Sequence, residues 1–188
     1  MSYQKQSDLY LEDNISKYPA IELLCKMGYK YISPEECVKQ RDSLYNVILK
    51  DTLRERLHSL NRYEYGGSVY KFTAENIEKA ITDLDEPLTD GLVRTSEKIY
   101  DALMLGKSYV ESLPDRTQKS FNLKYIDWDN IDNNVFHVTE EYACESMDKQ
   151  HNARLDIVLF VNGIPFAVIE CKAPTVSENQ AISQMIRN

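Results

Sequence analysis

The chain has 188 residues, 43% of them hydrophobic, and a formal net charge of -8. This length supplies one sizeable domain with a hydrophobic core, and we expect a single domain over residues 1–188. The negative charge excludes a protein that grips nucleic acid over its whole surface, because the phosphate backbone would be repelled. Residues 149–188 are the least acidic stretch. Any contact with DNA should therefore be local.

The four cysteines, Cys25, Cys37, Cys144 and Cys171, have no CxxC spacing. This scatter predicts buried free thiols rather than zinc ligands or disulfides, and it suits a reducing compartment. Residues 1–14 are polar, and no uninterrupted apolar run has membrane-spanning length. We expect a cytoplasmic protein that does not contact a membrane.

Residues 1–110 are predicted to be mainly helical. An apolar group ends at Gly28, a typical C-cap, and residues 29–32 have the pattern of a short strand. The sequence Ser-Pro-Glu-Glu at 33–36 has the form of a capping box and should begin a helix. Apolar residues then recur at roughly helical spacing to about Asn61.

Two further helices are predicted before residue 110. Thr73 should cap a helix whose apolar face consists of Ile77, Ala80, Ile81 and Leu84. The next helix spans about 92–105. Gly106-Lys107-Ser108 is a fragment of a phosphate-binding loop, but Asp101 stands where that motif has its first glycine. Gly106 is therefore predicted to end the helix, and we expect no ATP binding by this chain.

The pattern changes from helical to extended across the polar segment 111–120, which predicts an organisational boundary. The predicted strands cover 121–126, 135–139, 155–161 and 164–171. The last two are apolar on both faces, as in the middle of a sheet, and Asn162-Gly163 between them is a strong hairpin signal. A helix at 177–187 closes the chain. The fold class is thus α/β, with a mixed central β-sheet at 121–172 flanked by helices.

Three charged residues interrupt the two apolar strands: Asp156, Glu170 and Lys172. A buried unpaired charge costs several kcal/mol, so their presence needs a compensating partner. Two carboxylates that bind Mg²⁺ provide one, and a lysine two residues after Glu170 can orient a water or stabilise charge on phosphorus. The alternative is a solvated strand end with an ordinary ion pair between Asp156 and Arg154.

The pairing register of the hairpin decides between these interpretations. A simple two-residue turn would put Asp156 opposite Ile169 and Glu170 on the other face of the sheet, where a shared metal site fails. A loop one residue longer, with Gly163 in a G1 bulge, would put Asp156 directly across from Glu170. We therefore predict a bulge or an equivalent offset within 156–170.

Residues 153–172 read ARLDIVLFVNGIPFAVIECK. This segment resembles the N-terminal region of the R (restriction) subunit of type I restriction enzymes, whose signature is arginine-rich, then PDIVLFVNGLPL, then E-x-K. Weaker similarity extends over the rest of the chain. The resemblance implies a restriction-endonuclease-like nuclease domain of the PD-(D/E)xK superfamily. It also implies magnesium-dependent cleavage of unmodified double-stranded DNA, alongside methyltransferase (M) and specificity (S) subunits.

The resemblance assigns the site residues by position: Asp156 and Glu170 as magnesium ligands, the Cys171 carbonyl as a third ligand, Lys172 as the catalytic lysine and Gln184 as the glutamine of a Q-x-x-x-Y motif. Two positions depart from the family pattern, because Leu155 replaces a proline and Asn188 replaces the tyrosine. An upstream glutamate often joins such sites, and Glu12 and Glu22 are both candidates.

The R subunits of this family are much longer and carry ATP-driven translocase domains after the nuclease. The resemblance therefore implies that this chain is a fragment. The acidic surroundings of the motif predict that the site receives DNA from other domains. Two other functions remain open at this point. One is a stand-alone repair-type nuclease of the same superfamily, and the other is a non-catalytic module that docks to a methyltransferase or a motor. The acidity of the chain predicts weak, salt-sensitive DNA binding in isolation.

Overall fold

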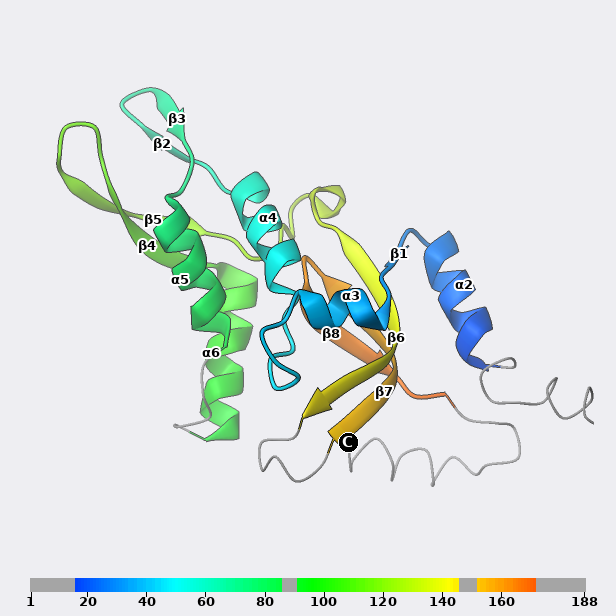
Figure 1. Ribbon diagram of the computed structural model, residues 1–188. Helices are drawn as coiled ribbons and strands as arrows, with labels where there is room; N and C mark the ends of the chain where they lie inside the picture. Colours follow the sequence, from blue (N-terminus) through cyan, green and yellow to red (C-terminus); the bar gives the residue numbers. More distant parts are fainter. Residues whose placement is uncertain (1–15, 86–90, 146–151, 172–188) are drawn as a thin grey trace, which may run out of the picture. The chain divides into compact units, whose positions relative to one another are not determined.

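The structure is a computed structural model that describes residues 16–85, 91–145 and 152–171. The chain divides into two compact units (Figure 1). Unit 1 comprises residues up to Val47 and from Phe136 onward, and unit 2 comprises Ile48–Val135. The sheet of unit 1 contains both parallel and antiparallel strands, which confirms the mixed α/β class. The expectation of a single domain over 1–188 stays a prediction.

Unit 1 contains two described helices and a four-stranded sheet. Its elements are α2 (Tyr18–Lys26), β1 (Lys30–Tyr31), α3 (Pro34–Lys39), β6 (Phe136–Glu145), β7 (Asn152–Val161) and β8 (Ile164–Ile169). The strand order is β1-β6-β7-β8, with β1 parallel to β6 and the other neighbours antiparallel. The predicted strand at 29–32 is thus β1, and the two hydrophobic strands of the hairpin are β7 and β8.

Helix α3 begins at the predicted capping box, since the Glu36 N–H donates to Ser33 Oγ at 3.2 Å. It ends at Lys39, so the helix expected to continue toward residue 61 is instead two helices. Buried Arg41 explains part of the break, because its Nη1 donates to the Asn46 carbonyl at 3.2 Å and to the Ala143 carbonyl at 3.1 Å. These bonds tie the connecting segment to β6 in place of helical hydrogen bonds.

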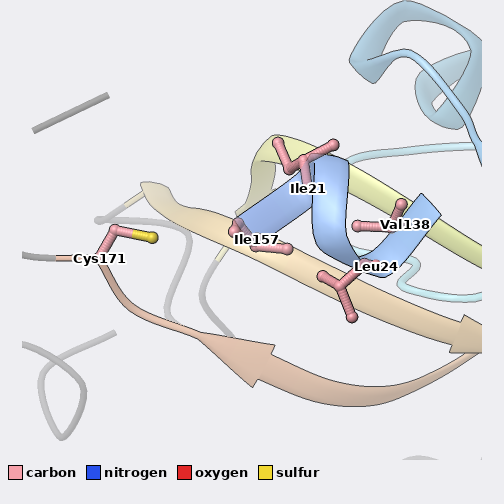
Figure 2. Packing of buried hydrophobic residues seen from close by; sticks show 5 residues of the cluster. All are labelled: Ile21, Leu24, Val138, Ile157 and Cys171. Carbon is pink, nitrogen blue, oxygen red and sulfur yellow. The ribbon is translucent and has the colours of Figure 1, made fainter. Parts of the chain in front are cut away.

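Helix α2 covers one face of the unit 1 sheet (Figure 2). Its buried residues Ile21 and Leu24 are spaced three apart and pack with Val138 of β6, Ile157 of β7 and Cys171 beyond β8. This apolar contact places the helix beside the end of the hairpin that carries the predicted site.

Unit 2 contains three α-helices, one 3-10 helix and two hairpins among its described residues. Its elements are α4 (Lys50–Leu60), β2 (Tyr63–Tyr65), β3 (Ser68–Tyr70), α5 (Ala74–Leu84), α6 (Leu92–Leu105), β4 (Lys107–Ser112), β5 (Gln118–Leu123) and η4 (Ile131–Asn133). Thr73 caps α5 as predicted, and the buried face of α5 is the predicted one. Helix α6 ends at Gly106, whose φ of 77° confirms its role as a terminator.

The prediction that the central sheet begins at residue 121 was wrong. Strand β5 pairs with β4 in a separate two-stranded sheet, and the polar segment between them is a hairpin turn rather than a boundary. Asp115 Oδ1 accepts hydrogen bonds from the Thr117 N–H and hydroxyl, and the Leu113 N–H donates to the Thr117 carbonyl. These local bonds close the turn and favour pairing of β5 with β4, the strand that precedes it in the sequence.

All four cysteines are free thiols, as predicted. Cys37 and Cys171 are buried and Cys144 is partly buried, but Cys25 is exposed, so the expectation of burial fails there. Across the three described ranges, no helix is long and apolar enough to cross a membrane.

Candidate active site

The turn between β7 and β8 is a two-residue turn, with Val161 paired to Ile164. Both central residues have positive φ, 53° at Asn162 and 85° at Gly163, which is the requirement of a type I′ turn. The prediction of a three-residue loop with a G1 bulge at Gly163 was therefore wrong.

The one-residue shift between β7 and β8 that was predicted at Gly163 lies further along the hairpin instead. Phe160 pairs with Pro165 and Leu159 pairs with Ala167, which leaves Phe166 as an extra residue in a β-bulge. The pairing then continues regularly to Ile157 opposite Ile169. The next position in this register sets Asp156 opposite Glu170, so the predicted offset within 156–170 is confirmed.

The site lies on the sheet face opposite α2. Ile157 and Cys171 belong to the apolar cluster under α2, and successive side chains on a strand point to opposite faces. Asp156 and Glu170, one residue before each of them, therefore point away from α2. Both carboxylate oxygens of Glu170 are buried from solvent.

A direct hydrogen bond fixes Asp156 against the end of the hairpin. The backbone N–H of Cys171 donates to Asp156 Oδ2 at 2.7 Å. The bond is charge-assisted because the acceptor is a carboxylate, and it leaves Oδ1 for another partner. The Cys171 thiol is 5% exposed within the apolar cluster, so only the backbone of this residue belongs to the site.

The chemistry of this donor set fits a hard divalent cation. Two carboxylates on neighbouring strands and an adjacent backbone carbonyl offer oxygen atoms, which Mg²⁺ prefers over sulfur or nitrogen. In the part of the chain that the structure describes, no three His, Cys, Asp or Glu residues gather as a metal-binding group. A cation at this position would take its oxygen ligands from Asp156, Glu170 and the Cys171 carbonyl.

The remaining predicted site residues either lie outside the described residues or do not face the candidate site. Lys172, Gln184 and Glu12 lie outside the described residues. Glu22 is on α2, where its carboxylate is 68% exposed and pairs with Lys26 at 2.6 Å. The buried residues of α2 are on its other side, so the fold gives Glu22 a solvent-facing ion pair.

The ordinary ion pair between Asp156 and Arg154 is not what forms. Arg154 Nε lies 2.6 Å from Glu141 Oε2, and the same Glu141 carboxylate accepts a hydrogen bond from buried Lys17 at 2.5 Å through Oε1. We did not identify Glu141 and Lys17 from the sequence. They lie far apart along the chain, and neither belongs to a recognisable motif.

The family model for the type I restriction enzyme R protein N terminus matches residues 9–188. The chain belongs to this family. A protein named as the endonuclease subunit of the type I restriction enzyme MjaIXP from Methanocaldococcus jannaschii is 28% identical over 177 residues, covering 91% of this chain and 16% of that protein. The EcoprrI endonuclease subunit from Escherichia coli is 28% identical over 186 residues, covering 99% of this chain and 50% of that protein.

A further relative is similar over a shorter stretch. The protein named as the MjaVIIP endonuclease subunit, also from Methanocaldococcus jannaschii, is 44% identical over 68 residues, or 34% of this chain. The chain spans at most half the length of these relatives. It is similar to the N-terminal part of restriction endonuclease subunits, which supports the resemblance drawn from residues 153–172.

Proposed function

We propose that this chain is the DNA-cutting domain of a type I restriction enzyme, and that it hydrolyses phosphodiester bonds of unmodified double-stranded DNA with Mg²⁺. The observation that carries the proposal is the β8 bulge at Phe166, after which the register runs to Ile157 opposite Ile169, one position before Asp156 and Glu170. A regular hairpin with the same turn would have separated the two carboxylates onto opposite faces. The bulge therefore serves the pairing of these two residues.

Each residue of the site has a separate task in this proposal. Asp156 is held by the Cys171 N–H through Oδ2, so Oδ1 is oriented for a cation. Glu170 supplies the second carboxylate, with its oxygens shielded from bulk water. When bound, magnesium supplies Lewis acidity toward a phosphodiester and lowers the pKa of a coordinated water. Lys172 is the proposed lysine that orients that water, and Gln184 the proposed polar group on the following helix.

The proposal extends to the assembly in which the domain works. The relatives are subunits of restriction enzymes, and they are at least twice as long as this chain. We infer that methyltransferase (M) and specificity (S) subunits supply target recognition, and that ATP-driven translocase domains outside this chain move the DNA. The compartment we propose is the cytoplasm, where unmodified DNA is encountered.

Substitution of the site residues in the assembled enzyme tests the proposal. Asp156→Ala, Glu170→Ala and Lys172→Ala should each abolish cleavage while ATP hydrolysis continues, because only the nuclease site is altered. Asp129→Ala is a matched control, since this carboxylate is 85% exposed and pairs with Lys124 in a turn of unit 2. Cleavage retained by all three site variants would overturn the proposal.

Further cleavage assays distinguish the proposed function from the stand-alone nuclease and from the docking module. A stand-alone nuclease would cut duplex DNA in Mg²⁺ without any other subunit, and Asp156→Ala would abolish that activity. A docking module would leave cleavage of the assembled enzyme unchanged when Asp156 and Glu170 are substituted. The proposed function predicts neither result.

A further inference from the structure

The β2–β3 and β4–β5 hairpins of unit 2 lie side by side and contact each other at two points (Figure 1). The Tyr63 ring of β2 stacks on the Phe121 ring of β5, with centroids 4.2 Å apart. Near the turns, the Tyr65 hydroxyl donates to Asp115 Oδ2 at 2.6 Å. The two hairpins are therefore joined, and we call them, with one flanking residue at each end, the hairpin pair, residues 62–71 and 106–124.

The hairpin pair is positively charged in an acidic chain. Its six cations are Arg62, Lys71, Lys107, Arg116, Lys119 and Lys124, and its three carboxylates are Glu64, Glu111 and Asp115. The pair thus carries +3, and since the whole chain carries -8, the rest of the chain carries -11. Glu111 is 1% exposed, so one of the three negative charges does not lie at the surface.

Several of these cations have no carboxylate partner. Lys107 lies 2.9 Å from Asp83 and Lys124 lies 2.7 Å from Asp129, so these two are paired. Three others are exposed: Lys71, Arg116 and Lys119. Within residues 16–85, 91–145 and 152–171, none of these three forms an ion pair with a carboxylate. Their charges are available to a partner outside the chain.

Two of the three exposed cations adjoin the aromatic contact between the hairpins. Lys119 precedes Phe121 by two residues on β5, and its Nζ lies 5.7 Å from the Phe121 ring centroid. Lys71 directly follows Tyr70, whose ring stacks on that of Tyr63 with centroids 5.6 Å apart. The backbone that carries both lysines is therefore held by packing within unit 2.

Arg116 belongs to the turn of the β4–β5 hairpin. It has a φ of 67° and directly follows Asp115, which accepts hydrogen bonds from the Tyr65 hydroxyl and from the Thr117 N–H and hydroxyl. These bonds hold the turn against the neighbouring hairpin. All three exposed cations are thus carried by ordered backbone of one joined element.

The aromatic rings at this contact are not available to nucleic-acid bases. Tyr63 is only 7% exposed, and its ring stacks with both Tyr70 and Phe121. Binding by base stacking requires rings that are open to solvent. The chemistry that remains on the hairpin pair is positive charge without counter-charge, which complements a polyanion. Duplex DNA carries about one negative charge per 1.7 Å of its axis.

We propose that the hairpin pair binds the phosphate backbone of duplex DNA through Lys71, Arg116 and Lys119. This inference rests on the proposed nuclease function, which makes DNA the substrate of the domain. The contact is independent of base sequence, because phosphate contacts position a protein on DNA without reading it. It is also weak, because the charge of -11 on the rest of the chain opposes it.

Fluorescence anisotropy of a short random-sequence DNA duplex, measured with the 188-residue chain and a chelator that prevents cleavage, tests the surface. The hairpin set combines Lys71→Ala, Lys119→Ala and Arg116→Asn, since asparagine accepts a positive φ better than alanine. Each lost phosphate contact lowers the slope of log K against log salt by about 0.9, so we expect a loss of about 2.7 and at least roughly tenfold weaker binding at low salt. Lys71→Ala with Lys119→Ala, which leaves the turn intact, should lower the slope by about 1.8.

A matched control set separates a local surface from net charge. Lys30→Ala, Lys79→Ala and Arg94→Ala remove the same numbers of lysines and arginines from exposed positions outside the hairpin pair. This set should change the slope by less than one contact, about 0.9. The charge-preserving set Lys71→Arg, Arg116→Lys and Lys119→Arg should bind within about twofold of the wild-type chain. Circular dichroism checks that every variant is folded.

An unchanged slope in the hairpin set, an equal loss in the control set, or no binding by the wild-type chain at low salt would each show that the hairpin pair is not a DNA-binding surface. The nuclease proposal is judged separately, by cleavage in the Asp156, Glu170 and Lys172 variants. Cleavage that depends on those residues, beside a failed binding test, removes only the role of the hairpin pair.

Discussion

Two strand carboxylates of this chain are held in different ways. Asp156 accepts one backbone hydrogen bond, from Cys171, which leaves an oxygen for chemistry. Glu111 on β4 is 1% exposed, and its Oε1 accepts hydrogen bonds from the Thr73 N–H at 2.9 Å, the Thr73 hydroxyl at 3.2 Å and Asn76 Nδ2 at 2.8 Å. Three donors on one oxygen at the start of α5 make Glu111 a structural cap.

Glu111→Ala should therefore destabilise the fold. The substitution leaves the Thr73 N–H and the Asn76 amide without this acceptor, and an unsatisfied buried donor costs about 1–3 kcal/mol. Urea unfolding measures the change, with Glu97→Ala on the exposed side of α6 as the control. Equal midpoints for the two variants would contradict the capping role.

His137 on β6 should make stability depend on pH. Burial lowers the pKa of His137 below its usual 6.5, and the positive charge of Lys30 lowers the pKa further. The folded state therefore favours the neutral imidazole. Its contribution to stability is complete above pH 6.5 and is lost as the pH falls from there toward the lower folded pKa.

The measurement is the urea midpoint of the wild-type chain and of His137→Gln between pH 8 and pH 5. The wild-type midpoint should fall more steeply below pH 6.5, because glutamine does not titrate in this range. Parallel curves for the two proteins would show that His137 is equally solvated in the folded and unfolded states.

At the scale of elements, both the turn and the bulge of the β7–β8 hairpin determine which residues of the two strands pair. The Asn162-Gly163 turn alone sets Val161 against Ile164, which is the register that separates the carboxylates. Phe166 then shifts β8 by one residue. The phenylalanine ring is 57% exposed, so the bulge is not explained by burial of this side chain.

Deletion of Phe166 should preserve the active site. Leu159 can then pair with Ala167 without a bulge, and Asp156 still lies opposite Glu170. We expect the assembled enzyme with this deletion to retain DNA cleavage, measured as conversion of circular DNA to linear product. Phe166→Ala separates loss of the ring from loss of the bulge. An inactive deletion beside an active Phe166→Ala would show that the bent strand itself is required.

At the scale of the whole molecule, charge limits what the chain does alone. The net charge of -8 opposes approach of a polyanion. The isolated chain should bind duplex DNA weakly, and raising salt from 50 to 200 mM should weaken binding further. Tight binding at physiological salt would contradict the view that other domains deliver the DNA.

Family membership and the fraction of each relative that this chain covers also favour delivery of DNA by other domains. The model of the R protein N terminus covers residues 9–188, while the relatives continue well beyond the matched part. With the function proposed above, the domain can keep an acidic surface, because DNA affinity need not reside in the unit proposed to cut. This is why cleavage of the assembled enzyme, and not of the fragment, is the decisive assay.

The sequence by itself determined the features that depend on local interactions. The cap at Thr73, the end of α6 at Gly106 and the Asn162-Gly163 turn were all predictable, because each is set by residues within a few positions of one another. The resemblance of residues 153–172 to a restriction signature also identified the family before any fold was known.

Only the tertiary structure decided what depends on residues far apart in the chain. It placed the bulge at Phe166 rather than in the turn, paired β5 with β4 instead of the central sheet, and brought Lys17 and Arg154 to Glu141. The reason is physical: strand partners and buried ion pairs are selected by packing and by the cost of burying charge, and neither leaves a pattern in a short stretch of sequence.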